Sequence, residues 1–206
     1  YGPIVFSKSK DACKKECYAA AMKYFLIFTL FAFLCVVGYM PILQHSIGAE
    51  YREGLRVVPI VMMAEIMMGV YFNLSFWYKL IDKTIWGAWF SMAGCIVLIA
   101  VNIIFIPKYG YMACAWGGVA GYGTAMVLSY IVGQKKYPIA YDTKGIGVYV
   151  LLTVVLFGIM DCIPWPNVVV QLFVNTCLII LYLYVVLKKD MPHDTISHIR
   201  SMLHLR

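Results

Sequence analysis

Six apolar runs, each long enough to cross a lipid bilayer as a helix, dominate this sequence of 206 residues. At a rise of about 1.5 Å per residue, about 20 residues cross a hydrocarbon core that is about 30 Å thick. The runs are Tyr24–Met40, Val57–Tyr78, Ile85–Ile106, Tyr111–Gly133, Gly145–Ile163 and Val168–Leu187. Each is continuously apolar rather than alternating, which favours helices over a membrane β-barrel. The sequence therefore predicts an all-α membrane protein with six transmembrane helices.

The composition supports lipid as the solvent. Hydrophobic residues make up 63% of the chain and charged residues only 13%, whereas soluble domains carry about 25% charged residues. Proline marks the ends of the runs, because it cannot continue the backbone hydrogen bonding of a helix interior. Pro41, Pro107 and Pro138 follow or separate runs, and Pro59 falls in a first turn, where its missing N–H costs nothing.

The basic residues predict the orientation of the chain in the membrane. If the six runs alternate in direction, all but three of the 17 Lys and Arg residues fall on one side. The three on the other side are Arg52, Arg56 and Lys108. Cytoplasmic loops carry the excess of Lys and Arg, so both ends are predicted to be cytoplasmic. The net charge of +7 then reflects orientation, and no nucleic-acid partner is expected.

Three segments are expected along the chain. Residues 1–23 form a cytoplasmic amphipathic linker, 24–187 a six-helix transmembrane lobe, and 188–206 a cytoplasmic tail. The linker contains a predicted amphipathic helix at Ser9–Met22, and the outer loop at 45–59 predicts a short interfacial helix. Because the chain begins without Met and ends in an ordinary charged tail, we expect it to be the C-terminal portion of a longer protein.

The sequence carries no pattern typical of an enzyme or a metal site. All four His lie outside the apolar runs, and no nucleophile–base pair or glycine-rich phosphate loop occurs at a recognisable spacing. Cys13 and Cys17 are four residues apart without a nearby His or second Cys pair. The seven Cys are therefore interpreted as small buried or interfacial residues. We expect no catalytic residue, no cofactor and no metal.

Glu65 lies near the middle of the second apolar run. A charged residue at the centre of a transmembrane helix costs about 2.5–3.5 kcal/mol on insertion scales. Glu65, Gly69 and Asn73 recur every four residues and so form one stripe along the helix. The stripe is either the wall of a cavity for substrate or ion transport, or the site of a hydrogen bond from Glu65 to a neighbouring helix.

Four further polar residues are candidates with two interpretations each. Asn102 is either a helix-packing amide or a cavity group. Arg52 and Arg56, four residues apart in the outer loop, are expected to share a helical face, where they either bind diphosphate oxygens or anchor the loop at the interface. Lys79 at the inner end of its run either contacts an anionic head group or follows from the cytoplasmic bias of lysine.

Small residues recur every four positions in the fourth run. They are Ala113, Gly117, Gly121 and Ala125. Such a ribbon allows a second helix to approach closely, so these residues are predicted to serve helix packing.

Three stretches carry a resemblance to a known family. They are LRVVPIVMMAEIMMGVYFNLSFWYKLIDKT, NIIFIPKYGYMACAWGGVAGYG and VLSYIVGQKKYPIAYD, in this order. Together they resemble the C-terminal part of bacterial polysaccharide biosynthesis proteins. These are the O-antigen and capsule oligosaccharide flippases of the multidrug/oligosaccharidyl-lipid/polysaccharide exporter superfamily. The resemblance covers residues 3–189, and the asparagine, "IP", "YG" and following small-residue helix within 102–121 are its most specific part.

The resemblance implies a fold and a function beyond what the residues alone indicate. It implies the second lobe of a two-lobe transporter in the bacterial inner membrane, which translocates undecaprenyl-diphosphate-linked oligosaccharides by alternating access for lipopolysaccharide and other surface polysaccharides. The implied partners are membrane lipid, the lipid-linked oligosaccharide, the N-terminal lobe of the same protein and a polysaccharide polymerase. An acidic Glu65 fits a proton- or cation-coupling group. The alternatives are a drug or cation antiporter of the same superfamily and a membrane-bound polysaccharide-assembly enzyme.

Overall fold

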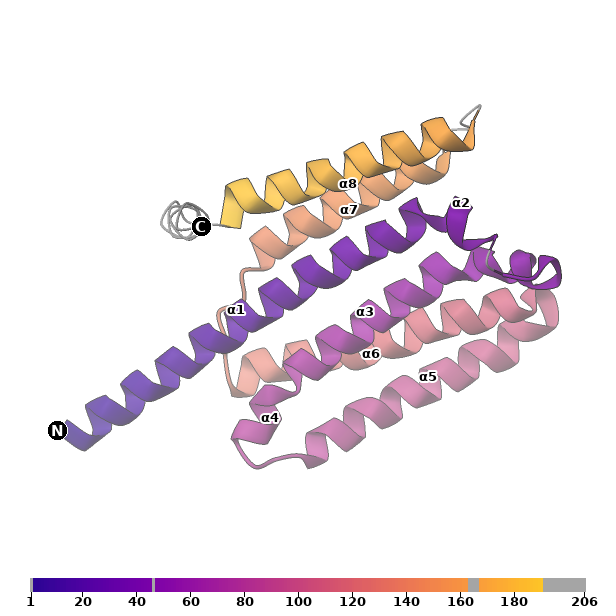
Figure 1. Ribbon diagram of the computed structural model, residues 1–206. Coiled ribbons are helices and arrows are strands. Elements are labelled where there is room, and N and C mark those ends of the chain that lie inside the picture. The colour runs from indigo at the N-terminus through magenta and orange to yellow at the C-terminus, as the bar shows by residue number, and fades with distance from the viewer. Residues whose placement is uncertain (1, 46, 163–166, 191–206) are drawn as a thin grey trace. The chain divides into compact units, whose positions relative to one another are not determined.

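The computed structural model describes residues 2–45, 47–162 and 167–190, and these residues are helices joined by short connections (Figure 1). The chain forms two compact units, which are described separately. The first unit comprises residues 1–29 and 47–147, and the second comprises 30–46 and 148–206. The helices are α1 (Gly2–Gly38), α2 (Met40–Leu43), η1 (Ala49–Val57), α3 (Val58–Leu74), α4 (Phe76–Leu80), α5 (Ile85–Tyr109), α6 (Tyr111–Lys136), α7 (Thr143–Cys162) and α8 (Val168–Asp190).

The prediction of an all-α membrane protein is confirmed. Within the described residues, six helical segments are long and apolar enough to cross a membrane. They are Lys15–Gly38, Glu50–Leu80, Ile85–Tyr109, Tyr111–Lys136, Thr143–Asp161 and Val168–Asp190. Helix α1 continues without interruption through residue 23, where the linker was expected to end. Most of the expected tail, residues 191–206, lies outside the described residues.

The helix boundaries differ from the expected runs at Pro107 and at Ser75. Pro59 occupies the first turn of α3, as predicted, whereas Pro107 lies inside the last turn of α5, which continues to Tyr109. The second run is not one continuous helix, because a single turn residue, Ser75, separates α3 from α4. The Ser75 hydroxyl donates to the Phe72 carbonyl at 2.6 Å, and such back-bonding from serine commonly bends helices.

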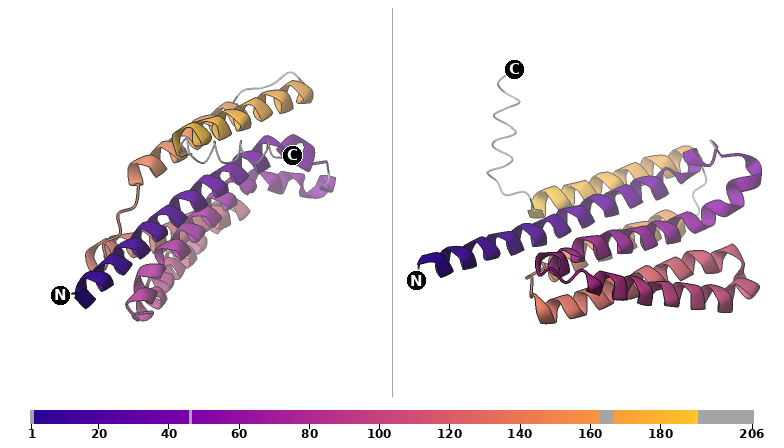
Figure 2. Two further views of the ribbon diagram at one scale, coloured as in Figure 1. Left: turned by 60° about the vertical axis from the view of Figure 1, so that its left-hand side comes forward. Right: turned by 90° about the horizontal axis from the view of Figure 1, so that it is seen from below.

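Helices α3, α5 and α6 form the core of the first unit (Figure 2). Helices α5 and α6 are antiparallel and joined through Gly110 alone, which has φ +55°. A left-handed φ favours glycine because it has no Cβ. Helix α3 packs against α6 and buries Ala64, Val70, Tyr71 and Leu74. Tyr71 belongs to a buried aromatic cluster that includes Trp77, Tyr78 and Phe90. Leu74 packs in a second cluster with Met22 and Leu26 of α1.

The loop between α6 and α7 is attached to α1 within the first unit. Lys23 Nζ lies 3.1 Å from Asp142 Oδ2, and Lys15 Nζ lies 4.1 Å from the centroid of the Tyr137 ring. Asp142 Oδ1 also accepts a hydrogen bond from the Gly145 N–H at 2.9 Å, so this carboxylate caps the first turn of α7. One side chain thereby connects α1 to the start of α7.

Replacing Asp142 by Asn should lower the free energy of unfolding by about 0.5–1 kcal/mol. Asparagine keeps the cap on α7 but loses the charge that pairs with Lys23, and the Asp142 side chain is 50% exposed, so water screens the pair. Asp82→Asn is the matched control, since Asp82 is an exposed turn residue with φ +53°, a conformation that Asn adopts equally well. Thermal unfolding in detergent measures both. Equal melting temperatures for the two variants would show that the pair contributes nothing.

The second unit joins the end of α1 to α7 and α8. The Asn175 amide nitrogen donates to the Gly38 carbonyl at 2.8 Å, and the Tyr39 and Thr176 hydroxyls lie 3.0 Å apart. The Tyr149 hydroxyl donates to the Asp190 carboxylate, which links α7 to α8. Asn175 is 1% exposed. Replacing it by an apolar residue would leave the buried Gly38 carbonyl without this hydrogen-bond donor.

Candidate functional site

Glu65 is exposed on α3 and makes no hydrogen bond or ion pair with another described residue. At 100° per residue, it points away from the buried side of α3 around Ala64 and Leu74. Its neighbours on the exposed face are Val61 and Phe72. The interhelical hydrogen bond considered for Glu65 is therefore not among the contacts of the described residues, and its carboxyl group is open to whatever covers this face.

The other two residues of the predicted stripe, Gly69 and Asn73, contact other parts of the protein. A Cβ on Gly69 would collide with the Phe25 ring of α1, so the glycine provides space for that ring. The Asn73 amide nitrogen donates to the Gly69 carbonyl at 3.0 Å, within the same helix. Of the three stripe residues, Glu65 alone is exposed.

Asn102 points into the interface between α5 and α6. Its side-chain oxygen is buried and has no hydrogen-bond partner among the described residues. A Cβ added to Gly117 would lie 2.5 Å from this oxygen, so the oxygen packs directly on the Gly117 backbone. Weak Cα–H···O contacts recur at such helix interfaces. The geometry matches the packing interpretation of Asn102.

The four small residues of α6 are all buried. Ala113, Gly117, Gly121 and Ala125 form one side of α6, and Gly121 meets Gly94 of α5 backbone to backbone. A Cβ on Gly121 would lie 2.8 Å from the Gly94 carbonyl oxygen, and a Cβ on Gly94 would lie 2.7 Å from the Gly121 oxygen. The two helices therefore cross at a distance that only glycine at both positions allows.

Two further residues of this ribbon were missed by the sequence reasoning. Ser129 and Gly133 continue the four-residue spacing and are also buried. The Ser129 hydroxyl accepts a hydrogen bond from Trp77 Nε1 at 3.3 Å, and a Cβ on Gly133 would lie 2.8 Å from the same nitrogen. The spacing itself carried the signal, since 129 and 133 follow 125 at intervals of four.

Arg52 and Arg56 do not share a face, contrary to the expectation from α-helical spacing. Helix η1 is a 3₁₀ helix, in which residues three apart align and residues four apart are turned by about 120°. Arg56 therefore aligns with Glu50 and Glu53, which offset its charge. Arg52 Nε donates to the Ile47 carbonyl at 3.4 Å. Lys79 is exposed on α4, with Nζ 5.6 Å from the centroid of the Phe76 ring.

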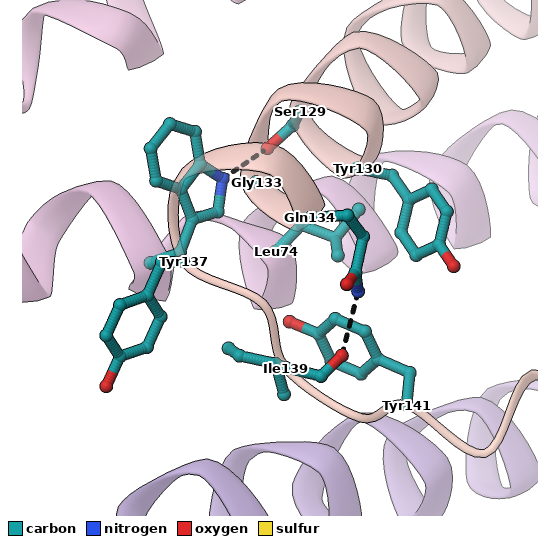
Figure 3. A pocket seen from close by; sticks show the side chains of 9 residues that line it. Leu74, Ser129, Tyr130, Gly133, Gln134, Tyr137, Ile139 and Tyr141 are labelled. Atoms are coloured by element: carbon teal, nitrogen blue, oxygen red, sulfur yellow. Dashed lines mark hydrogen bonds between the residues drawn. The ribbon is translucent and has the colours of Figure 1, made fainter. Parts of the chain in front are cut away.

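A small cavity lies where the α6–α7 loop meets the aromatic cluster (Figure 3). Its volume of about 10 Å³ is close to the minimum for one water molecule. Figure 3 shows the Gln134 side chain directed at Ile139, and Gln134 Nε2 donates to the Ile139 carbonyl at 2.8 Å. Burial, and secondarily Tyr130, raise the pKa of Tyr141 to about 12, so its hydroxyl is neutral at physiological pH. The Gln134–Ile139 hydrogen bond fixes the loop to the end of α6, and the cavity is too small for a substrate.

The cysteines and the possible metal ligands were located in the described part of the chain. No group of three or more His, Cys, Asp or Glu residues lies close enough together there to hold a metal ion. Cys17, Cys35, Cys95, Cys114 and Cys177 are free thiols, and all but Cys35 are exposed rather than buried. No protein-family model, curated protein or solved structure matches this chain.

Proposed function

We propose that this chain is the C-terminal portion of a transporter that moves lipid-linked oligosaccharides across the bacterial inner membrane. The substrate is an undecaprenyl-diphosphate-linked sugar unit for surface polysaccharide, and both ends of the chain lie in the cytoplasm. The resemblance of residues 3–189 supports the family, and the six apolar helices support a multi-pass membrane protein. The observation that carries the proposal is the exposed carboxyl group of Glu65 within a membrane-spanning helix.

An exposed carboxyl group in an apolar helix is costly when lipid covers it. The cost falls where water, a cation or an arginine of the N-terminal lobe faces Glu65. A residue whose free energy differs between two conformations biases the equilibrium between them. Glu65 then couples proton or cation binding to the alternating exposure of a cavity between the two lobes. Oligosaccharide translocation needs no covalent step, so the proposal requires no catalytic residue.

A second candidate is a drug or cation antiporter of the same superfamily. Two observations favour it. Glu65 is acidic, and Arg56 aligns with Glu50 and Glu53 on η1, which leaves little net positive charge for a diphosphate at that loop. In an antiporter of this kind, the organic cation that is transported would itself bind the Glu65 carboxylate. In the flippase, Glu65 would instead bind the proton or cation that drives transport.

Replacing Glu65 by Gln in the complete protein should reduce translocation of a labelled lipid-linked oligosaccharide in proteoliposomes by about tenfold or more, a barrier change of about 1.4 kcal/mol. Glutamine has the same shape but cannot ionise. The remaining transport should no longer respond to the pH gradient. Asp82→Asn, at an exposed carboxyl group in the turn between α4 and α5, is the matched control and should transport normally.

Three results of this experiment bear on the proposal. Normal oligosaccharide transport by the Glu65→Gln variant at every pH would remove Glu65 from the mechanism. Saturable uptake of an organic cation that depends on Glu65, without oligosaccharide transport, would replace the proposal with the antiporter. Covalent conversion of the sugar-linked lipid without transfer between leaflets would identify a polysaccharide-assembly enzyme instead.

A further inference from the structure

An apolar groove of about 530 Å³ runs between α5 and α6 in the first unit. Small-molecule sites typically measure about 300–1,000 Å³. Its lining residues are Val101, Phe105, Tyr109, Met112, Ala113, Trp116 and Ala120. The small side chains of Ala113 and Ala120 provide the depth, and the exposed rings of Phe105, Tyr109 and Trp116 form the walls. The polar groups among these lining side chains are the Tyr109 hydroxyl and the Trp116 ring nitrogen.

The groove lies in the membrane and begins at one end of the helix pair. Both helices belong to membrane-spanning segments, and Tyr109 and Met112 flank the Gly110 turn. From Met112 to Ala120 the groove extends about 12 Å along α6, which is most of a leaflet about 15 Å thick. Exposed Tyr109 and Tyr111 beside Gly110 place its open end among the lipid head groups, where aromatic rings concentrate.

A basic residue lies next to this open end of the groove. Lys108, next to Tyr109 in the last turn of α5, is exposed and makes no ion pair or side-chain hydrogen bond with another described residue. Lysines close to a membrane surface attract anionic lipids. One lysine matches the single negative charge of a phosphatidylglycerol phosphate, whereas a polyprenyl diphosphate carries more negative charge than one lysine balances.

We propose that the α5–α6 groove binds one acyl chain of an anionic phospholipid, with the lipid phosphate at Lys108. The rings of Phe105 and Trp116 flank the chain, and Ala113 and Ala120 form its floor. This site is separate from Glu65 on α3 and does not depend on the proposed transport function. Its role is to hold this end of the α5–α6 pair at the membrane surface.

The test is native mass spectrometry of the complete protein with phosphatidylglycerol and phosphatidylcholine of identical acyl chains. The unmodified protein should retain phosphatidylglycerol in preference. Ala120→Leu fills the groove and should lower the retention of both lipids, while Ala100→Leu, at an exposed alanine of α5 outside the groove, should not. Lys108→Gln should lower phosphatidylglycerol retention roughly fivefold and remove the preference. Lys83→Gln, an exposed lysine between α4 and α5, is its control.

A second measurement does not require the groove-filling variant to fold. Phosphatidylglycerol with bromine on its acyl chain should quench the tryptophan fluorescence of Trp116. That contribution is identified as the quenched component that is absent from the Trp116→Phe variant. The proposal is overturned if Ala120→Leu binds lipid normally, if phosphatidylcholine binds as well as phosphatidylglycerol, or if Trp116 is not quenched. It is also overturned if a polyprenyl phosphate occupies the groove and phosphatidylglycerol cannot displace it.

Discussion

Replacing Gly121 by Ala is expected to lower the stability of the first unit by about 1–3 kcal/mol, the usual cost of overpacking a close interface. The added methyl group would lie 2.8 Å from the Gly94 carbonyl oxygen. That oxygen belongs to backbone within a helix, so a side-chain rotation cannot relieve the collision. Helices α5 and α6 must instead separate, and in a bilayer such packing supplies much of the free energy of helix association. Gly94→Ala should have a similar effect, because its Cβ would lie 2.7 Å from the Gly121 oxygen.

Gly123→Ala on the same helix is the matched control. A Cβ there would meet only the Met67 sulfur within 4 Å, at an ordinary 3.5 Å. Alanine is favoured over glycine in helices by about 1 kcal/mol, so this variant should be neutral or more stable. Denaturation of the purified protein by graded SDS, followed by circular dichroism, measures all three variants. The close glycine crossing would be refuted if Gly121→Ala and Gly123→Ala unfolded at the same SDS concentration.

Trp77→Ala is expected to destabilise the first unit by about 2–4 kcal/mol, somewhat less than the roughly 3–5 kcal/mol that truncating a buried aromatic residue costs in a soluble core. Trp77 is 1% exposed, and its ring lies among Tyr78, Trp86 and Phe90, with centroid separations of 5.4 to 6.4 Å. The expected cost is smaller here because lipid is as apolar as the protein interior, so packing rather than hydrophobic transfer is lost. The Trp77–Ser129 hydrogen bond is lost as well.

Trp89→Ala separates this effect from the general consequences of removing a tryptophan. Trp89 lies on α5 and is 59% exposed, so its removal should change the free energy of unfolding, measured from the SDS midpoint, by no more than about 0.5 kcal/mol. Trp77→Phe should have an intermediate effect, since it keeps much of the ring packing and leaves the Ser129 hydroxyl without its donor. If Trp77→Ala and Trp89→Ala unfold alike, the aromatic cluster does not stabilise this end of the unit.

The sequence was informative wherever one physical requirement controls the structure over many residues. A bilayer demands long apolar helices, so the six spans could be read from residue composition, and Pro59 marked the start of α3 as expected. The side of α6 that packs was visible in the four-residue spacing of Ala113 to Ala125, and the structure extends it to Gly133. The partner of that ribbon was not visible, because Phe90 and Leu98, four residues to either side of Gly94 on α5, are large.

Other features depend on local geometry that residue type leaves open. The outer loop was expected to be helical, but its 3₁₀ form changes which residues align, and this separated Arg52 from Arg56. Ser75 looks like an ordinary residue of an apolar run, and only its hydrogen bond to Phe72 shows why the helix is interrupted there. Gly69 looked like part of a polar stripe until the Phe25 ring was found to occupy the space beside it.

The sequence by itself determined that this protein is a bundle of membrane-crossing helices with an ionisable group inside one span. Both properties follow from residue type, since hydropathy and charge do not depend on neighbours. The tertiary structure decided which way each residue faces: it directs Asn102 into the α5–α6 interface and leaves the Glu65 carboxyl group exposed. In a span that is apolar on all sides, no hydrophobic face selects one rotation of the helix. The rotation is therefore chosen by packing against α1 and α6, which arise from distant parts of the chain.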